Sequence, residues 1–205
     1  MKIAIIGSGN VGGALAQKWA HAGHEVIIGT RDPQNFKGKQ LLAVKGVSAQ
    51  ETKAAVAAAS VILIATPAAA AVEVAGSLGD TTGKVIIDAM NIVGGKGPEG
   101  FGSTALALLA HTQTRDVVKC FNTTGFNNID NPVYGEQKLD LFMAGDSAAA
   151  KEVARGLALD AGFAECYDVG GNDKFQLMEQ FAFFWINLAM MRGHGREIGF
   201  KLLKR

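Results

Sequence analysis

The sequence contains little cysteine, little proline and no long apolar stretch. Two cysteines, Cys120 and Cys166, are too few for a disulfide framework, and both lie inside apolar runs, so we expect two buried free thiols in a reducing compartment. No apolar run reaches the ~18 residues that a membrane-spanning helix needs, and the chain starts directly with a predicted strand rather than with a signal peptide. We therefore expect a cytoplasmic protein that does not enter a membrane.

An excess of either charge is missing as well. The chain has 20 basic and 19 acidic residues and a formal net charge of +1, and no basic stripe with interleaved aromatic residues, so no nucleic-acid partner is expected. His21 and His24 are three residues apart, but no cluster of Cys or carboxylates accompanies them, and no metal is expected. Because no Ser-His-Asp, Cys-His or paired-carboxylate arrangement appears, we assign no catalytic acid, base or nucleophile.

Glycine, by contrast, is abundant, and a glycine motif stands at the start of the chain. Residues 3–6 predict a strand buried on both faces, the motif G-S-G-N-V-G follows at once, and apolar residues then recur at helical spacing. In that setting Gly7 permits a tight turn, Gly9 lets a pyrophosphate approach the backbone, and Gly12 lets the helix pack closely on the strand. The positive end of the helix dipole then faces the phosphates. The stretch predicts dinucleotide binding.

The end of the second predicted strand indicates which dinucleotide is bound. NAD-binding folds usually place an acidic residue there to hold the ribose 2′-hydroxyl, whereas this chain has Thr30 and Arg31. Arg binds phosphate with two parallel hydrogen bonds and Thr adds a donor, which suits the 2′-phosphate of NADP. Lys37 or Lys39 would add a further positive contact, and Asp32 must turn away or cap the next helix. We predict NADP rather than NAD, with a solvated loop arginine as the alternative.

Short apolar segments alternate with predicted helices along the chain, without linkers or repeats. The predicted strands cover residues 3–6, 25–29, a segment around 47, 60–65, 84–88, 116–121, 139–145 and 163–169. This alternation predicts an α/β fold, namely a Rossmann-type, doubly wound, mostly parallel sheet of about eight strands. An NADP-binding domain would span residues 1–170. Residues 171–205 would form a C-terminal apolar helix and a tail, packed on that domain or at a dimer interface.

Several of these strands end in residues that can contact a ligand. In this architecture ligands bind at the carboxyl ends of the strands. Ala65, Thr66 and Pro67 end one strand and could line the nicotinamide ribose, and Asn91 follows the next strand with both a donor and an acceptor. A polar loop at 122–128 could form a pocket for a planar ring. Ordinary turn chemistry would explain the same residues.

The last predicted helix, residues 175–191, is apolar on nearly all sides. Its polar residues form one narrow stripe, interrupted by Phe183: Gln176, Glu179, Gln180 and Asn187. A helix of this kind must be covered, and a subunit interface is the simplest cover for its outer side, so a homodimer is expected. Packing within one chain is the alternative.

With these residues placed, the chain resembles the NADPH-dependent oxidoreductases of the deazaflavin coenzyme F420 over nearly its whole length. The motifs that carry the resemblance are IGSGNVG at 6–12, GTRDP at 29–33, ATP at 65–67, DAMN at 88–91, VVKCFNTTG at 117–125, FMAGD at 142–146 and the tail through GFKLLKR. The cytosolic domain of the six-transmembrane metalloreductases looks like the same fold. The resemblance implies that NADP lies across the sheet edge and that a deazaflavin or flavin stacks near the nicotinamide.

Carried over by residue, the resemblance assigns each part of the cofactor to a part of this chain. The fingerprint glycines with Ser8, Asn10 and Val11 would hold the pyrophosphate, and Thr30 with Arg31 would take the 2′-phosphate. The nicotinamide side would be lined by Thr66, Pro67, Asn91 and Asn122. The segment 170–173 departs from the more apolar loop of the deazaflavin enzymes, which leaves the acceptor open between F420 and a flavin.

The leading interpretation is an NADPH-dependent oxidoreductase that passes hydride between NADP(H) and a small-molecule acceptor. Such a transfer needs positioning and a dry site more than a charged catalytic side chain. A β-hydroxyacid or imine reductase is one alternative, because a lysine follows a glycine-rich turn at 170–174; those enzymes, however, have a large helical second domain. A non-enzymatic NADP sensor, with the cofactor half but no reactive second site, is the other.

Overall fold

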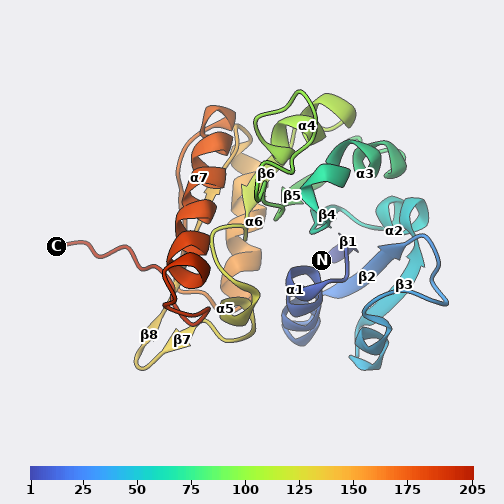
Figure 1. The fold of residues 1–205 in the computed structure, drawn as a ribbon. Helices are drawn as coiled ribbons and strands as arrows, with labels where there is room; N and C mark the ends of the chain where they lie inside the picture. Colours follow the sequence, from blue (N-terminus) through green and yellow to red (C-terminus); the bar gives the residue numbers. More distant parts are fainter.

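The computed structural model describes residues 1–205 and contains one eight-stranded sheet with helices on both faces (Figure 1). Its strands are β1 (Lys2–Ile6), β2 (Glu25–Thr30), β3 (Val47–Glu51), β4 (Val61–Ile64), β5 (Val85–Asp88), β6 (Val117–Cys120), β9 (Asp140–Ala144) and β10 (Glu165–Asp168). Their spatial order is β10-β9-β6-β5-β4-β1-β2-β3. From β3 to β6 all pairs are parallel, in the order 3-2-1-4-5-6 that is typical of dinucleotide-binding sheets.

Two strands extend this sheet in the opposite direction. β9 pairs antiparallel with β6, and β10 pairs parallel with β9. The predicted α/β class, the doubly wound topology and the mostly parallel eight-stranded sheet are therefore confirmed. The carboxyl ends of β1, β2, β4, β5 and β6 all lie at one edge of the sheet, and the carboxyl ends of β9 and β10 lie at the other.

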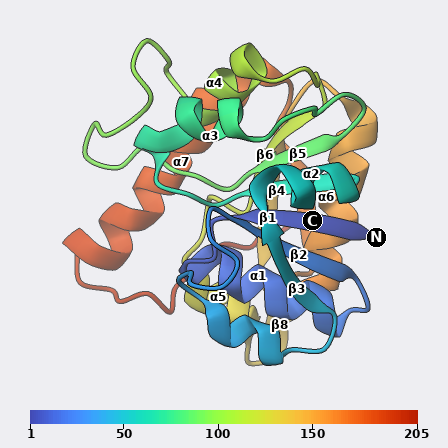
Figure 2. The same ribbon diagram turned by 90° about the vertical axis from the view of Figure 1, so that its right-hand side faces the viewer.

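The helices divide between the two faces of the sheet. They are α1 (Asn10–His21), α2 (Thr52–Ala58), α3 (Ala71–Ser77), α4 (Thr104–His111), α5 (Phe126–Asp130), α6 (Ala148–Asp160) and α7 (Phe175–Ile186), with short 3-10 turns η1 (Lys39–Ala43), η2 (Ala68–Ala70) and η3 (Asn172–Lys174). One core lies under α1, α5 and α6, and the other under α2, α3, α4 and the start of α7. Figure 2 shows α3 and α4 on the side of the sheet opposite to α1.

Two local features differ from the sequence prediction. The polar segment at 122–128 is a loop only up to Gly125, and its second half begins the short helix α5. After α5 the chain forms a small hairpin, β7 (Val133–Tyr134) and β8 (Gln137–Lys138), which the sequence analysis missed. Only two residues form each strand of the hairpin, so no apolar alternation marks it, and the turn at Gly135 with φ of 59° is its one local signal.

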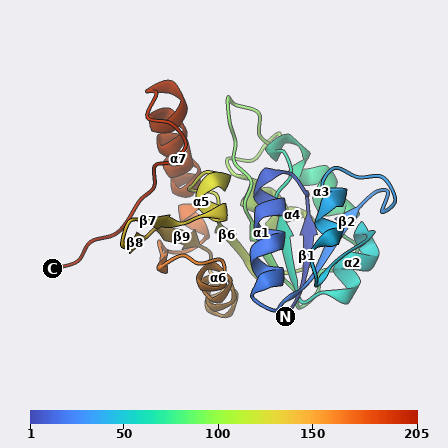
Figure 3. The ribbon, with the colours of Figure 1, turned by 90° about the horizontal axis from the view of Figure 1, so that it is seen from below.

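The C-terminal helix has the predicted extent, because α7 continues into the π-helical turn η4 (Asn187–Met191). Figure 3 shows α7 at the end of the molecule that carries β9, away from β2. The predicted polar stripe is wrong for Glu179, which points inward and is only 9% exposed. It turns inward because its carboxylate pairs with the buried ammonium of Lys119, 2.8 Å away.

Two further expectations concern residue environments. Cys120 and Cys166 are free and buried, as predicted, and their sulfur atoms lie 3.6 Å apart. None of the helices combines the length and the apolar character of a membrane span.

Candidate dinucleotide-binding site

The glycine turn after β1 is built so tightly that two of its glycines have no room for a side chain. Gly7 has φ of 103°, and a Cβ atom there would lie 2.5 Å from the carbonyl oxygen of Ala65. A Cβ atom on Gly12 would lie 1.9 Å from the carbonyl oxygen of Gly7. The first contact fixes the turn against the end of β4, and the second fixes α1 against the turn. Gly9 differs, because no atom lies within 4 Å of the position of its Cβ.

The beginning of α1 presents free backbone donors beside this open position. Gly9 is the residue before the helix and supplies no capping side chain, and no acidic residue occupies the first turn. The N–H groups of the first turn of a helix have no partner within the helix, and they carry its positive dipole end. Asn10 is exposed and Val11 half-buried, so this end of the helix faces outward. The geometry suits an anionic group.

A hollow of ≈ 210 Å³ lies next to the turn. Ser8 connects its two sides, because the hydroxyl of Ser8 donates to the carbonyl oxygen of Lys37. Gly38, with φ of 91°, allows that close approach, since a Cβ there would lie 2.7 Å from the carbonyl oxygen of Ser8. The hollow is lined by Ser8, Gly9, Asn10, Gly13, Ala14, Gln17, Lys37, Gly38, Gln40, Leu41, Phe126 and Asp130.

The end of β2 places its polar residues at the start of the loop that reaches this hollow. Thr30 is half-buried, and Arg31 is exposed and forms no ion pair within the chain. The Asp32 carboxylate accepts hydrogen bonds from the backbone N–H groups of residues 34 and 35, at 2.9 and 3.3 Å, and so caps the local turn. Lys39 donates to the carbonyl oxygen of Gln34 at 2.7 Å, whereas Lys37 lines the hollow.

The ends of β4, β5 and β6 meet at the same edge of the sheet. Thr66 is half-buried and donates to the sulfur of Met90 at 3.3 Å. Asn91 donates to the carbonyl oxygen of Asn122 at 2.7 Å, and the Asn122 amide donates back to the side-chain oxygen of Asn91 at 3.0 Å. The structure thus brings together residues that the sequence separates by as many as 56 positions. Asn122 itself is only 2% exposed, Asn91 is half-buried, and Pro67 is exposed.

The reciprocal pair depends on an unusual backbone conformation that sequence reasoning missed. Phe121 has φ of 64°, and no other non-glycine residue has a positive φ. For a bulky residue this conformation is strained and persists only where packing over-determines it. The Phe121 ring is buried against Trp19, with the ring centroids 5.6 Å apart. This packing turns the chain at the end of β6, so that Asn122 faces Asn91.

Known proteins with the same sequence pattern are NADP-dependent reductases. A family model described as NADP oxidoreductase, coenzyme F420-dependent, matches residues 2–92. Two curated F420-dependent NADP reductases, from Methanothermobacter thermautotrophicus and Methanothermobacter marburgensis, are each 29% identical to the chain. The alignments cover 98% and 92% of this chain and 94% and 92% of the relatives. The chain is therefore similar to F420-dependent NADP reductases over nearly its whole length.

Solved structures show the same similarity. A crystal structure from Arthrobacter sp. FB24, provisionally named an F420-dependent NADP reductase, is 26% identical, with a TM-score of 0.83 over the full length of both chains. A hypothetical protein from Sinorhizobium meliloti is 25% identical, with a TM-score of 0.72. A reductive aminase from Aspergillus terreus in complex with NADPH has a TM-score of 0.66 at 20% identity, and this likeness shows the fold alone.

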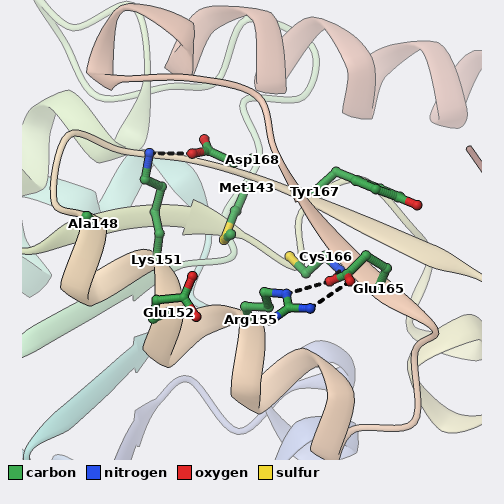
Figure 4. A pocket seen from close by; sticks show the side chains of 9 residues that line it. All are labelled: Met143, Ala148, Lys151, Glu152, Arg155, Glu165, Cys166, Tyr167 and Asp168. Atoms are coloured by element: carbon green, nitrogen blue, oxygen red, sulfur yellow. Dashed lines mark hydrogen bonds and ion pairs between the residues drawn. The ribbon is translucent and has the colours of Figure 1, made fainter.

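A second hollow, of ≈ 340 Å³, lies between α6 and β10 (Figure 4). β10 is the outermost strand of the sheet, on the side opposite to β3. Four of the five charged side chains of the hollow are already paired with one another, and Glu152 is the exception. Lys151 lies 2.6 Å from Asp168, and Arg155 donates two hydrogen bonds to Glu165, at 2.7 and 2.8 Å. No residue of the predicted dinucleotide site lines this hollow, so it is separate from the fingerprint turn.

The Arg155–Glu165 pair predicts a pH dependence of stability. Hydrogen bonds from Arg155 and from the backbone N–H of Cys166 lower the pKa of Glu165 from 4.5 to about 2. Because the folded-state pKa lies below the unfolded value, the stabilisation is complete above pH 4.5 and is lost as the pH falls toward 2. Glu165→Gln should therefore lower the free energy of unfolding by about 0.5–1 kcal/mol at neutral pH and by less in acid. Urea unfolding at pH 7 and pH 3 measures both values, and an equal loss at the two pH values would contradict the prediction.

Proposed function

We propose that the protein is an NADPH-dependent oxidoreductase that transfers hydride between NADP(H) and coenzyme F420 or a flavin-like acceptor. One observation carries the proposal: the fingerprint turn, Arg31 and the Asn91–Asn122 pair all lie at the same edge of the sheet, where the parallel strands end. It is supported by the curated F420-dependent NADP reductases, which are similar over nearly the whole chain. The free, buried thiols suit a reducing, cytoplasmic location.

The residues at this edge fit the parts of NADP. Gly9 leaves open space beside the free N–H groups of α1, so the turn formed by Gly7, Ser8, Gly9, Asn10, Val11 and Gly12 would hold the pyrophosphate. Thr30, Arg31 and Lys37 would bind the 2′-phosphate, because neither cation forms an ion pair within the chain. Ala65, Thr66, Pro67, Asn91 and Asn122 would surround the nicotinamide side.

Bound NADPH would supply the hydride, and the chain's own residues would position it and exclude water. No charged side chain needs to act as acid or base in such a transfer, since orientation of the two partners lowers the barrier. The apolar residues of α7 would provide a dry wall beside the Asn91–Asn122 pair. Met178 already contacts that pair, because its carbonyl oxygen accepts a hydrogen bond from Asn122 at 3.2 Å.

The acceptor can be tested directly with the purified protein. NADPH absorbance should fall on addition of F420, FMN, FAD or a quinone, with the fastest turnover for a deazaflavin or flavin. An Arg31→Ala control should need a higher NADPH concentration for the same rate. Tight NADPH binding without turnover of any acceptor would favour a sensor instead of an enzyme.

The imine or β-hydroxyacid reductase alternative has one observation in its favour, namely Lys174 after a glycine-rich turn. Lys174 pairs with Asp173 in the structure, and the neighbouring Asn172 exchanges hydrogen bonds with Asp146, just after β9. Because β9 runs antiparallel to β6, this turn follows carboxyl ends that lie at the opposite edge from Asn91. The position of Lys174 therefore favours an F420-type reductase over an imine or β-hydroxyacid reductase. Turnover of hydroxy acids that Lys174→Ala abolished would reverse that preference.

We also propose that the protein is a homodimer in which α7 contributes the interface. Residues 171–205 would then form an assembly segment on an NADP-binding domain of residues 1–170. The outer face of α7 and η4 carries a group of large apolar side chains that are 45–62% exposed: Leu177, Phe183, Phe184, Met190 and Met191. Apolar groups of this size on a soluble surface usually mark an interaction site.

Replacing Phe183 by Glu should shift the dimer toward monomer, because a buried carboxylate without a partner opposes association. Light scattering and sedimentation at micromolar concentration would measure the change. Leu159→Glu is a matched control, since Leu159 is 39% exposed on α6, outside the proposed interface. A wild-type monomer under these conditions would contradict the dimer and leave the cofactor assignment untouched.

A further inference from the structure

Three charged side chains lie buried together beneath the Asn91–Asn122 pair. Lys119 on β6 is 2.9 Å from the carboxylate of Asp88 on β5 and 2.8 Å from that of Glu179 on α7. Lys119 and Asp88 are fully buried, and Lys119 also donates to the carbonyl oxygen of Met90 at 2.9 Å. Thr104 joins the cluster, since its hydroxyl lies 2.9 Å from the Lys119 ammonium and donates to Asp88 at 2.5 Å.

Stability alone does not explain such a cluster. Removing two or three charges from water is expensive, and an apolar replacement of equal volume is often neutral or stabilising. The best-attested use of buried charges is to fix one arrangement of the chain among several that are similar in energy. The arrangement fixed here involves one helix, α7, and the loops that follow two neighbouring strands.

Two consecutive residues of α7 hold those two loops. The Glu179 carboxylate accepts a hydrogen bond from the backbone N–H of Ile92 at 2.8 Å, immediately after Asn91. The carbonyl oxygen of Met178 accepts a hydrogen bond from Asn122 at 3.2 Å. At the other end of the first loop, Asp88 accepts from the backbone N–H of Met90 at 2.9 Å. The loop from 88 to 92 is therefore held at both ends by members of one charged cluster.

We infer that the Asp88–Lys119–Glu179 cluster positions the nicotinamide-side loops, and that Glu179 is the positioning residue that connects them to α7. The inference rests on the proposed function. The cluster should affect binding of the nicotinamide half of NADP and not of the adenosine half. None of its hydrogen bonds involves the fingerprint turn or the loop that carries Arg31. Glu179 acts through Ile92 and Asn91 and touches no reacting group.

The experiment compares two ligands that share the adenosine half. NADP⁺ contains the nicotinamide, and 2′-phospho-ADP-ribose lacks it. Glu179→Gln keeps the size of the side chain and an acceptor for the Ile92 N–H, but it removes the charge that faces Lys119. By titration calorimetry, this variant should bind NADP⁺ roughly tenfold more weakly and bind 2′-phospho-ADP-ribose within about twofold of the wild type. Gln180→Ala, at an exposed neighbouring position on α7, should change neither Kd.

A second variant and a measurement without cofactor guard against a simple folding defect. Glu179→Asp keeps the charge in the cluster but is one methylene too short to reach both Lys119 and Ile92, and it should show the same selective loss. In the cofactor-free protein, hydrogen exchange of the segment 89–95 should be faster in both variants than in the wild type. Equal losses for both ligands, or no loss for either in both variants, would overturn the positioning role. A wild-type protein that binds neither ligand would overturn the proposed function itself.

Discussion

A Gly9→Val variant is expected to keep its fold and to lose measurable binding of NADPH and NADH alike. The position of a Cβ on Gly9 has no atom within 4 Å, and the backbone there has φ of −74°, outside the positive range that favours glycine. The branched side chain would fill the space through which a pyrophosphate approaches the N–H groups of α1. The variant would lose several hydrogen bonds to the pyrophosphate at once, and hydrogen bonds to a charged group are the strong ones. We therefore expect a larger loss of affinity than removal of a single contact would cause.

The variant can be judged against two other glycines. Gly76 on α3 also has open space at its Cβ position, so Gly76→Val should leave both the fold and NADPH binding intact. Gly12→Ala should instead destabilise the protein by about 1–3 kcal/mol, because its Cβ would lie 1.9 Å from the carbonyl oxygen of Gly7. Circular dichroism, thermal unfolding and calorimetric titration separate these effects. A folded Gly9→Val protein with normal NADPH affinity would refute the phosphate-binding role of the turn.

The fold was predictable because its strands and helices are indicated by short, continuous segments of the sequence. Each central strand is a short apolar run that ends in a turn residue, and each run is followed by a segment of helical spacing. Ser147 shows how well such local signals work, since its hydroxyl caps the start of α6 by accepting from the N–H of Ala150. The β7–β8 hairpin lacks any such signal, because two residues per strand cannot show a period.

The candidate site was predictable where strand ends define it and hidden where buried side chains do. Asn91 and Asn122 could be expected at the same edge, because both follow parallel neighbouring strands. Lys119 could not be assigned a partner, since its carboxylates lie 31 residues before it and 60 residues after it. Glu179 was wrongly placed in the exposed polar stripe of residues 175–191 for the same reason, since its partner Lys119 is distant in the sequence. A charged residue among apolar ones indicates either solvent or a buried partner, and periodicity alone does not distinguish the two.

The preference for NADPH over NADH should depend on Arg31. Arg31→Ala is expected to weaken NADPH binding roughly ten- to hundredfold, which corresponds to the ~1.5–3 kcal/mol of a charge-assisted hydrogen bond to phosphate. NADH affinity should change little, because NADH has no 2′-phosphate to contact. The structure leaves this guanidinium exposed at the end of β2, without an ion pair, while Asp32 is occupied in capping the next turn.

The two nearby lysines provide an internal comparison for the Arg31 measurement. Lys37 lines the hollow beside Ser8, so Lys37→Ala should reduce NADPH affinity in the same direction as Arg31→Ala but by less, since a lysine offers no bidentate contact. Lys39 donates to the carbonyl oxygen of Gln34, and Lys39→Ala should leave the ratio of NADPH to NADH affinity unchanged. Because a 2′-phosphate contact is screened by salt, the loss on Arg31→Ala should shrink as ionic strength rises. Equal losses of NADPH and NADH affinity would instead mean that Arg31 supports the loop rather than the phosphate.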